Sequence, residues 1–216
     1  MLLAELFLLC TLDPLRGTVL PNRSVAHQPR FLATALIIEL AICRELKRFE
    51  DGMHLDHDLP SFHILVDRVR EAIKRANKGF TPDQAIELTL HELPNLREDL
   101  LDGLAERGVL HTGRRRYWLF GERPYPLRSR QAAAEAIELL RAGASGADRS
   151  LRSMAAAALA TGSGLATILL PAEQSNHLHI WMRELARAQQ QPIDPEQQGD
   201  AEASAVMIAL SHALSG

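Results

Sequence analysis

The sequence predicts a mainly α-helical protein, a single compact domain around one buried central helix, with a small β-hairpin. Hydrophobic residues make up 46% of the 216 residues, which is enough for a substantial core, but only 5% are aromatic. Alanine, leucine and arginine are abundant, and these residues favour helices over a sandwich or barrel. The third observation is one long run that is apolar on all sides, which predicts a helix surrounded by the rest of the protein.

The first predicted element is a core helix formed by MLLAELFLLCTL, which ends at Asp13 and Pro14. This stretch has no basic residues at its start, is interrupted by Glu5, and is shorter than the roughly 18 apolar residues that a membrane span needs. We therefore expect any membrane contact to be peripheral. Residues 17–29 are predicted as a loop with room for a short hairpin.

The central helix is predicted at residues 31–46, FLATALIIELAICREL, where only Thr34 and Glu39 are polar before Arg44. An unpaired carboxylate is too costly to bury, so Glu39 needs an arginine or a backbone donor as its partner. A structural ion pair is the favoured interpretation, and a catalytic acid is the alternative. Cys10 and Cys43 lie in apolar runs and are interpreted as buried, reduced thiols.

The remaining helices are predicted from apolar periodicity and from capping residues. Ser61 is the expected N-cap of the first of them, Thr81 with Pro82 starts the second, and Gly108 is the expected left-handed cap of the third. Residues 190–200 form a polar linker before the last helix, within one domain that covers residues 1–216. The predicted helices are residues 62–76, 81–93, 95–107, 131–142, 150–160, 165–170, 177–189 and 201–214.

The predicted hairpin follows Gly108 and is strongly basic. Its two short β-prone runs are residues 109–112 and 115–120, and Pro124 and Pro126 prevent further ladder pairing. Residues 107–130 hold seven arginines and one acid, a local charge of +6, whereas the other 17 basic and 26 acidic residues give −9. Arginines beside aromatic residues suit a surface that meets phosphates. The candidate residues of this surface are Arg114, Arg115, Arg116 and Trp118.

No sequence pattern singles out an enzyme. His54 and His57 have a spacing that can bind metal, but they lie in residues 47–60, a polar stretch interpreted as a loop, with no cysteine nearby. His177 and His179 are interpreted as surface or boundary residues. Hydrolase, kinase and nucleotide-binding motifs are absent from the sequence. We therefore expect no catalytic residues, no metal and no cofactor.

Three segments together carry a resemblance to a known family. They are LLAELFLLCTLDPLRGTVL at the N-terminus, LIIELAICREL in the central helix, and NLREDLLDGLAERGVL followed by the hairpin with its LF and YPL. In the order and spacing of these segments, the chain resembles the Golgi phosphoprotein 3 family, which includes bacterial relatives of unassigned role. The resemblance covers roughly residues 1–170.

This resemblance implies a helical peripheral membrane adaptor at the cytosolic face. Eukaryotic members bind phosphatidylinositol 4-phosphate and the cytosolic tails of Golgi glycosyltransferases. The family's lipid site has a tryptophan after the first helix and an arginine at the start of the second helix. It also has two arginines, three residues apart, at the start of the helix that leads into the GVL segment. Here Arg97 matches the second of that pair, and Pro94 stands at the first. Ala33 aligns with the arginine of the second helix, Arg30 lies about one turn earlier, and the tryptophan is missing.

The first functional hypothesis is a cytoplasmic protein that binds anionic phospholipid headgroups at a membrane. Arg97, together with Arg23 or Arg30, would bind the phosphate, and the hairpin arginines would add a less selective surface. Protein tails at the membrane and a second copy of the chain are further partners consistent with the family. For the Arg114–Arg116 run, a solvated face without a binding role is an equally good interpretation.

The alternative hypothesis is a winged-helix-like nucleic-acid-binding protein, because two short helices precede a basic hairpin that resembles a wing. The second of these helices would be the recognition helix. It carries four acidic residues that would repel phosphates, so a nucleic-acid partner is disfavoured. These residues are Glu98, Asp99, Asp102 and Glu106.

Overall fold

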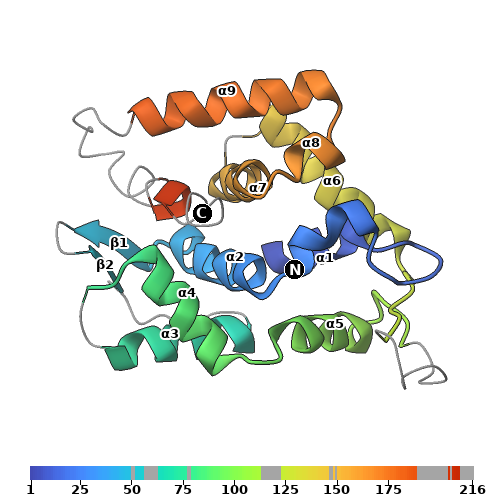
Figure 1. Cartoon of the computed structure of the whole chain (residues 1–216), viewed down its shortest axis with the longest axis horizontal. Helices are drawn as coiled ribbons and strands as arrows, with labels where there is room; N and C mark the ends of the chain where they lie inside the picture. Colours follow the sequence, from blue (N-terminus) through green and yellow to red (C-terminus); the bar gives the residue numbers. More distant parts are fainter. Residues whose placement is uncertain are drawn as a thin grey trace.

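The computed structural model confirms the predicted fold class: the protein is mainly helical, with one two-stranded antiparallel sheet among the described residues. The structure describes residues 1–49, 52–55, 63–76, 79–112, 123–145, 148, 150–188, 204 and 206–209. In Figure 1, α3, α4 and α5 form the lower part of the molecule, α1 and α2 the middle, and α6 to α9 the upper part.

The helices differ from the predicted ones mainly at their ends. Helix α1 is followed by a 3₁₀ helix, η1, where the sequence suggested room for a hairpin. The helices are α1 Leu3–Thr11, η1 Pro21–His27, α2 Pro29–Ile42, α3 Ile64–Ala76, α4 Pro82–Glu92, α5 Leu96–Glu106, α6 Arg130–Ala144, α7 Leu151–Gly162, α8 Ala166–Leu169 and α9 Ala172–Ala188. Residues 206–209 are also helical, and the rest of the predicted last helix and the 190–200 linker lie almost wholly outside the described residues.

Helix α2 is the predicted central helix. Every residue from Phe31 to Ala41 is buried, and the helix contacts α1, α3, α4, α5 and α7. The rings of Phe7 and Phe31 meet edge to face at 5.2 Å, which joins α1 to the start of α2. One hydrophobic cluster extends from Leu2, the N-cap of α1, to Met207 near the C-terminus. Burial on all sides therefore follows from an apolar surface on all sides, as the sequence predicted.

Helix α2 ends four residues earlier than predicted. Arg44 adopts a left-handed conformation with φ of 58°, and the Glu45 amide donates to the Leu40 carbonyl at 2.9 Å. This arrangement ends helices and usually uses glycine at the left-handed position. Because arginine gives no such signal, the sequence could not reveal the end of this helix.

The sheet contradicts the interpretation of residues 47–60 as a loop. Strands β1 (Leu46–Phe49) and β2 (Gly52–Leu55) pair in antiparallel fashion, and His54 lies on β2 opposite Lys47. Met53 is 2% exposed and exchanges two backbone hydrogen bonds with Phe80, at 2.8 and 3.0 Å. The hairpin is thus supported by a partner 27 residues away in the chain, which local polarity does not show.

Capping residues are largely placed as predicted. The Thr81 hydroxyl accepts from the Gln84 amide, and the Gln84 side chain accepts from the Thr81 amide, so both halves of a capping box start α4. Gly108 has φ of 72° after α5. Helix α9 begins directly after Pro171, five residues before the predicted start at His177, because proline is compatible with the first positions of a helix. Ser61 lies outside the described residues.

The predicted basic hairpin lies mostly outside the described residues, which omit residues 113–122. On either side of it, Leu110 and Leu127 form an isolated antiparallel bridge, and the His111 amide donates to the Pro126 carbonyl at 2.8 Å. Pro126 thus takes part in pairing as an acceptor, although it has no amide to donate.

Candidate functional site

Arg97 lies in the first turn of α5 and is tied to the 3₁₀ helix η1. Its Nε donates to Nδ1 of His27 at 3.2 Å, and its Nη1 lies 3.1 Å from a carboxylate oxygen of Glu98. The Arg97 side chain is 18% exposed and Glu98 is 57% exposed. An ion pair at such an exposed carboxylate contributes little to stability, whereas the hydrogen bond to His27 ties Arg97 to a buried side chain.

His27 is buried, and its two ring nitrogens have different roles. Its Nε2 lies 2.7 Å from the Thr11 hydroxyl, whose own proton is directed to the carbonyls of Phe7 and Leu8. The hydroxyl oxygen therefore accepts from Nε2–H, which leaves Nδ1 to accept from Arg97. Burial, and secondarily the charge of Arg97, lowers the pKa of His27 to about 3.

This low pKa predicts that the protein loses stability in mild acid. Unfolded His27 takes up a proton near pH 6.5 and folded His27 only near pH 3, so its contribution is complete above pH 6.5 and is lost as the pH falls towards 3. Between pH 7 and pH 5 we expect a loss of about 2 kcal/mol. Urea unfolding at both pH values measures it.

The variant His27→Gln should show a much smaller difference between the two pH values, because it removes the titrating group. His91→Gln, at an exposed position on α4, provides the matched control and should keep the full difference. An unchanged pH dependence in His27→Gln would contradict the assignment.

Arg23 is the second candidate, and it is anchored close to the first. Its Nη1 donates to the Cys10 carbonyl at 2.8 Å, next in sequence to the Thr11 that holds His27. Its Nε–H is buried without an acceptor among the described residues. Arg23 and Arg97 are therefore both positioned by the junction of α1 and η1, through a carbonyl and an imidazole.

Arg30 is positioned differently. It lies in the first turn of α2, and its guanidinium contacts Asp83 at 2.6 Å and Glu87 at 3.0 Å, both on α4. These two carboxylates already balance its charge, so the contacts of Arg30 join α2 to α4. The structure brings Arg97 and Arg23 to the same junction and holds Arg30 against another helix.

Two arginines of the basic 107–130 segment also contact acids of the same chain. Arg107 pairs with the buried Glu5, and Arg123 pairs with Asp102 at 3.1 Å while lying 5.2 Å from the centre of the Tyr125 ring. They join α5 to α1 and to the segment after the hairpin. The other candidates, Arg114, Arg115, Arg116 and Trp118, lie outside the described residues.

Glu39 has the partners expected of a structural ion pair. The Leu3 amide donates to it at 2.6 Å, and Nη1 of Arg152 lies 3.3 Å away. Of the metal candidates, His54 is described and His57 is not. The part of the chain that the structure describes holds no cluster of three or more potential metal ligands and no helix suited to crossing a membrane. Cys10 is buried and Cys43 half-buried, both as free thiols.

A comparison with family sequence models identifies the chain. The model of the Golgi phosphoprotein 3 (GPP34) family matches residues 2–214. The protein belongs to this family. A comparison with curated proteins gives no significant match.

In this Golgi phosphoprotein 3 family member, the structure distinguishes two arginines that the resemblance had singled out. Arg97 is where the family pattern places an arginine, and Arg30, a turn before the aligned Ala33, contacts α4 instead. No pattern in the sequence selects His27, because its partners Thr11 and Arg97 are 16 and 70 residues away. Only the packing of η1 against α1 and α2, which brings His27 to Arg97 at the start of α5, makes the connection visible.

Proposed function

We propose that this protein is a peripheral membrane adaptor that binds anionic phospholipid headgroups of the phosphatidylinositol 4-phosphate type. The site is formed by Arg97 with Arg23 at the junction of α1, η1 and α5. Membership of the Golgi phosphoprotein 3 family supports membrane association. The observation that carries the choice of residues is the hydrogen bond from Arg97 Nε to a neutral, buried His27.

This hydrogen bond suits phosphate binding for an electrostatic reason. A neutral imidazole fixes the orientation of the guanidinium without cancelling its charge, and a planar guanidinium presents paired N–H donors that match phosphate oxygens. The Glu98 carboxylate is solvent-exposed, so a phosphate carrying nearly two charges can displace it at little cost.

Because the chain has a net negative charge, its overall electrostatics favour binding to the membrane through a local basic site and not through general attraction to an anionic surface. The chain carries a net charge of −3, and exposed acids such as Asp99 and Glu106 lie on the same helix as Arg97. Each basic residue near an anionic membrane contributes about 1 kcal/mol, so two or three give weak and reversible attachment. These acids also oppose the alternative hypothesis of nucleic-acid binding through α5.

Flotation with liposomes tests the proposal directly. The full chain is mixed, at low salt, with phosphatidylcholine vesicles that contain about 5% phosphatidylinositol 4-phosphate or none. We expect binding only to the first set, and a loss of about five- to tenfold in Arg97→Ala and in Arg23→Ala, from the loss of one charge-assisted contact each.

Two variants serve as matched controls. Arg75→Ala removes an exposed arginine on α3 that pairs with Glu92 on α4, and Arg30→Ala removes the candidate that already contacts two carboxylates. Both should bind nearly as well as the unmodified chain. The absence of binding to phosphoinositide vesicles by the unmodified chain would refute the function, whereas equal losses in all four variants would refute the assigned site.

A further inference from the structure

Thr11, the last residue of α1, joins this helix to His27 through its hydroxyl group. The hydroxyl donates its proton to the carbonyls of Phe7 and Leu8, at 2.9 and 2.8 Å, and its oxygen lies 2.7 Å from Nε2 of His27. A threonine hydroxyl has only one proton to donate. Because that proton is directed to the backbone of α1, the oxygen accepts from the imidazole, and the hydrogen of the neutral ring lies on Nε2.

The arginine on the other side of the ring requires the same tautomer. Arg97 Nε, which always carries a hydrogen, lies 3.2 Å from Nδ1 of His27, so Nδ1 accepts and has no hydrogen of its own. Thr11, His27 and Arg97 therefore form one hydrogen-bond chain in which both ring nitrogens have a suitable partner. With the hydrogen on Nδ1 instead, two N–H groups would face each other between His27 and Arg97.

This hydrogen-bond chain is largely enclosed by protein. Thr11 is 0% exposed, His27 is 9% exposed, and the Arg97 side chain is 18% exposed. In such a buried place, an N–H group without an acceptor loses its hydration and gains no bond in return. The opposite tautomer is therefore disfavoured, and the acceptor that Thr11 offers to Nε2 keeps Nδ1 available for Arg97.

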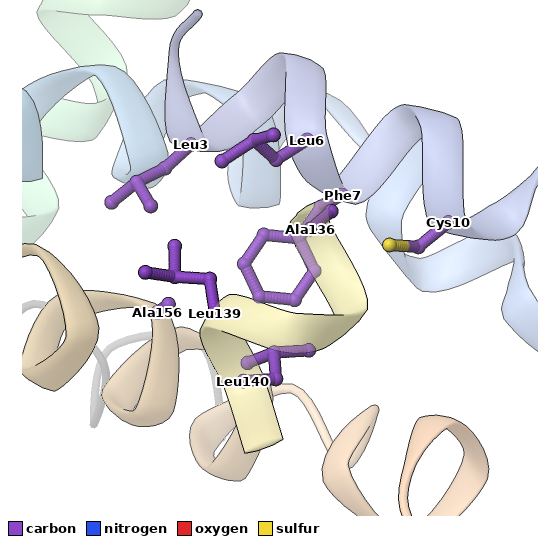
Figure 2. Close-up of a pocket in the computed structure, with 8 residues that line it drawn as sticks. All are labelled: Leu3, Leu6, Phe7, Cys10, Ala136, Leu139, Leu140 and Ala156. Carbon is purple, nitrogen blue, oxygen red and sulfur yellow. The ribbon is translucent and has the colours of Figure 1, made fainter. Parts of the chain in front are cut away.

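Packing gives the hydrogen-bond chain a fixed starting point in α1. Every residue of α1 is buried, and the apolar crevice between α1 and α6 has a volume of only about 10 Å³, room for at most one water. Because α1 has little space in which to shift, its carbonyls and the Thr11 hydroxyl stay in place. Figure 2 shows the side chains that line this crevice, which are Leu3, Leu6, Phe7, Cys10, Ala136, Leu139, Leu140 and Ala156.

We propose that Thr11 is a positioning residue of the phosphate site, because through His27 it fixes the direction of the Arg97 guanidinium. This inference rests on the function proposed above. Since Nε of Arg97 is committed to the imidazole, a phosphate contacts this arginine through the two terminal nitrogens, whose planar pair matches two phosphate oxygens. Arg23 lies outside the hydrogen-bond chain, because it is held by the backbone carbonyl of Cys10.

Three variants separate this role from a general effect on stability. Thr11→Val replaces the hydroxyl with a methyl group and leaves Nε2–H of His27 without its acceptor, whereas Thr11→Ser keeps the hydroxyl. Thr89→Val is the matched control. Thr89 on α4 is equally buried, and its hydroxyl donates to the carbonyl of Ala85, four residues earlier, at 2.8 Å. The control therefore removes the same kind of bond to the helix backbone from another helix.

The tautomer is measured without any ligand, by ¹⁵N NMR of the histidine rings in the full chain, with His27→Gln to assign the signal. We expect the hydrogen on Nε2 in the unmodified chain, in Thr11→Ser and in Thr89→Val. In Thr11→Val, part of the population should carry it on Nδ1, and the Arg97 Nε–H should exchange faster with water. A hydrogen on Nδ1 in the unmodified chain, or unchanged His27 and Arg97 signals in Thr11→Val, would overturn the inference.

Flotation with the phosphatidylinositol 4-phosphate vesicles measures the consequence for binding. Thr11→Val should bind about threefold less well than the unmodified chain, as expected for one lost member of a hydrogen-bond network, and Thr11→Ser and Thr89→Val should bind normally. Added to Arg97→Ala, Thr11→Val should have no further effect, whereas added to Arg23→Ala it should keep its full effect.

The two proposals fail in different ways. If the unmodified chain does not bind these vesicles, the proposed function itself is refuted. If the unmodified chain binds but Thr11→Val weakens binding equally in the Arg97→Ala and Arg23→Ala backgrounds, or no more than Thr89→Val does, only the positioning role of Thr11 is refuted.

Discussion

Replacing Arg70 with methionine is expected to destabilise the fold by about 3–5 kcal/mol, the range found when one partner of a buried ion pair is removed. Arg70 on α3 is 3% exposed and binds both oxygens of Glu45, at 2.6 and 2.8 Å; the Glu45 side chain is 2% exposed. Glu45 lies between α2 and β1, so this pair joins three elements. Without the guanidinium, the carboxylate remains buried without a counter-charge. Urea unfolding at pH 7 measures the change.

Two further variants identify the cause of this loss. Arg75→Met on the same helix removes an exposed arginine paired with Glu92, and it should cost about 1 kcal/mol or less. The double variant Arg70→Met, Glu45→Met removes both charges and should be more stable than Arg70→Met alone, because no unpaired charge stays buried. A double variant that is less stable than the single one would show that packing, and not charge, dominates.

Replacing Gly17 with alanine is expected to cost about 3 kcal/mol. Gly17 has φ of 66°, which costs other residues about 1–2 kcal/mol. A Cβ at this position would also lie 2.1 Å from backbone atoms of Tyr125 and Pro126. Since backbone cannot rotate away, the two segments must separate, and the hydrogen bond from the Tyr125 amide to the Gly17 carbonyl at 2.8 Å weakens.

Gly164 provides the matched control for this substitution. Its φ is 72°, and a Cβ there would meet nothing within 4 Å, so Gly164→Ala bears only the conformational cost. We expect about 1–2 kcal/mol for Gly164→Ala in the same unfolding experiment. If the two variants lose equal stability, the close approach of residues 125–126 to Gly17 does not contribute.

Much of the fold was predictable because its signals are local. The apolar run that became α2, the Thr81 N-cap and the left-handed Gly108 each depend on neighbours within a few residues. Local signals failed where a distant contact decides the conformation. Strand β2 is completed by Phe80, and α2 is ended by a left-handed arginine that leads to the buried Glu45.

The candidate site was predictable only in part. Arg97 followed from its position in a recognisable segment, whereas its partner His27 did not, because no pattern connects residues 70 positions apart. Arg30 and Arg23 looked alike in the sequence as arginines near the start of α2. Their surroundings distinguish them, since Arg30 contacts two carboxylates and Arg23 contacts a carbonyl.

The sequence by itself determined the helical class, the central position of α2, most helix starts and the family of this protein. These depend on composition, periodicity and the order of segments, which are properties of the chain before it folds. Only the tertiary structure decided which arginines are balanced by acids, which histidine stays neutral, and which threonine it bonds to. Charge balance and burial depend on neighbours brought together by packing, and those neighbours are far apart along the chain.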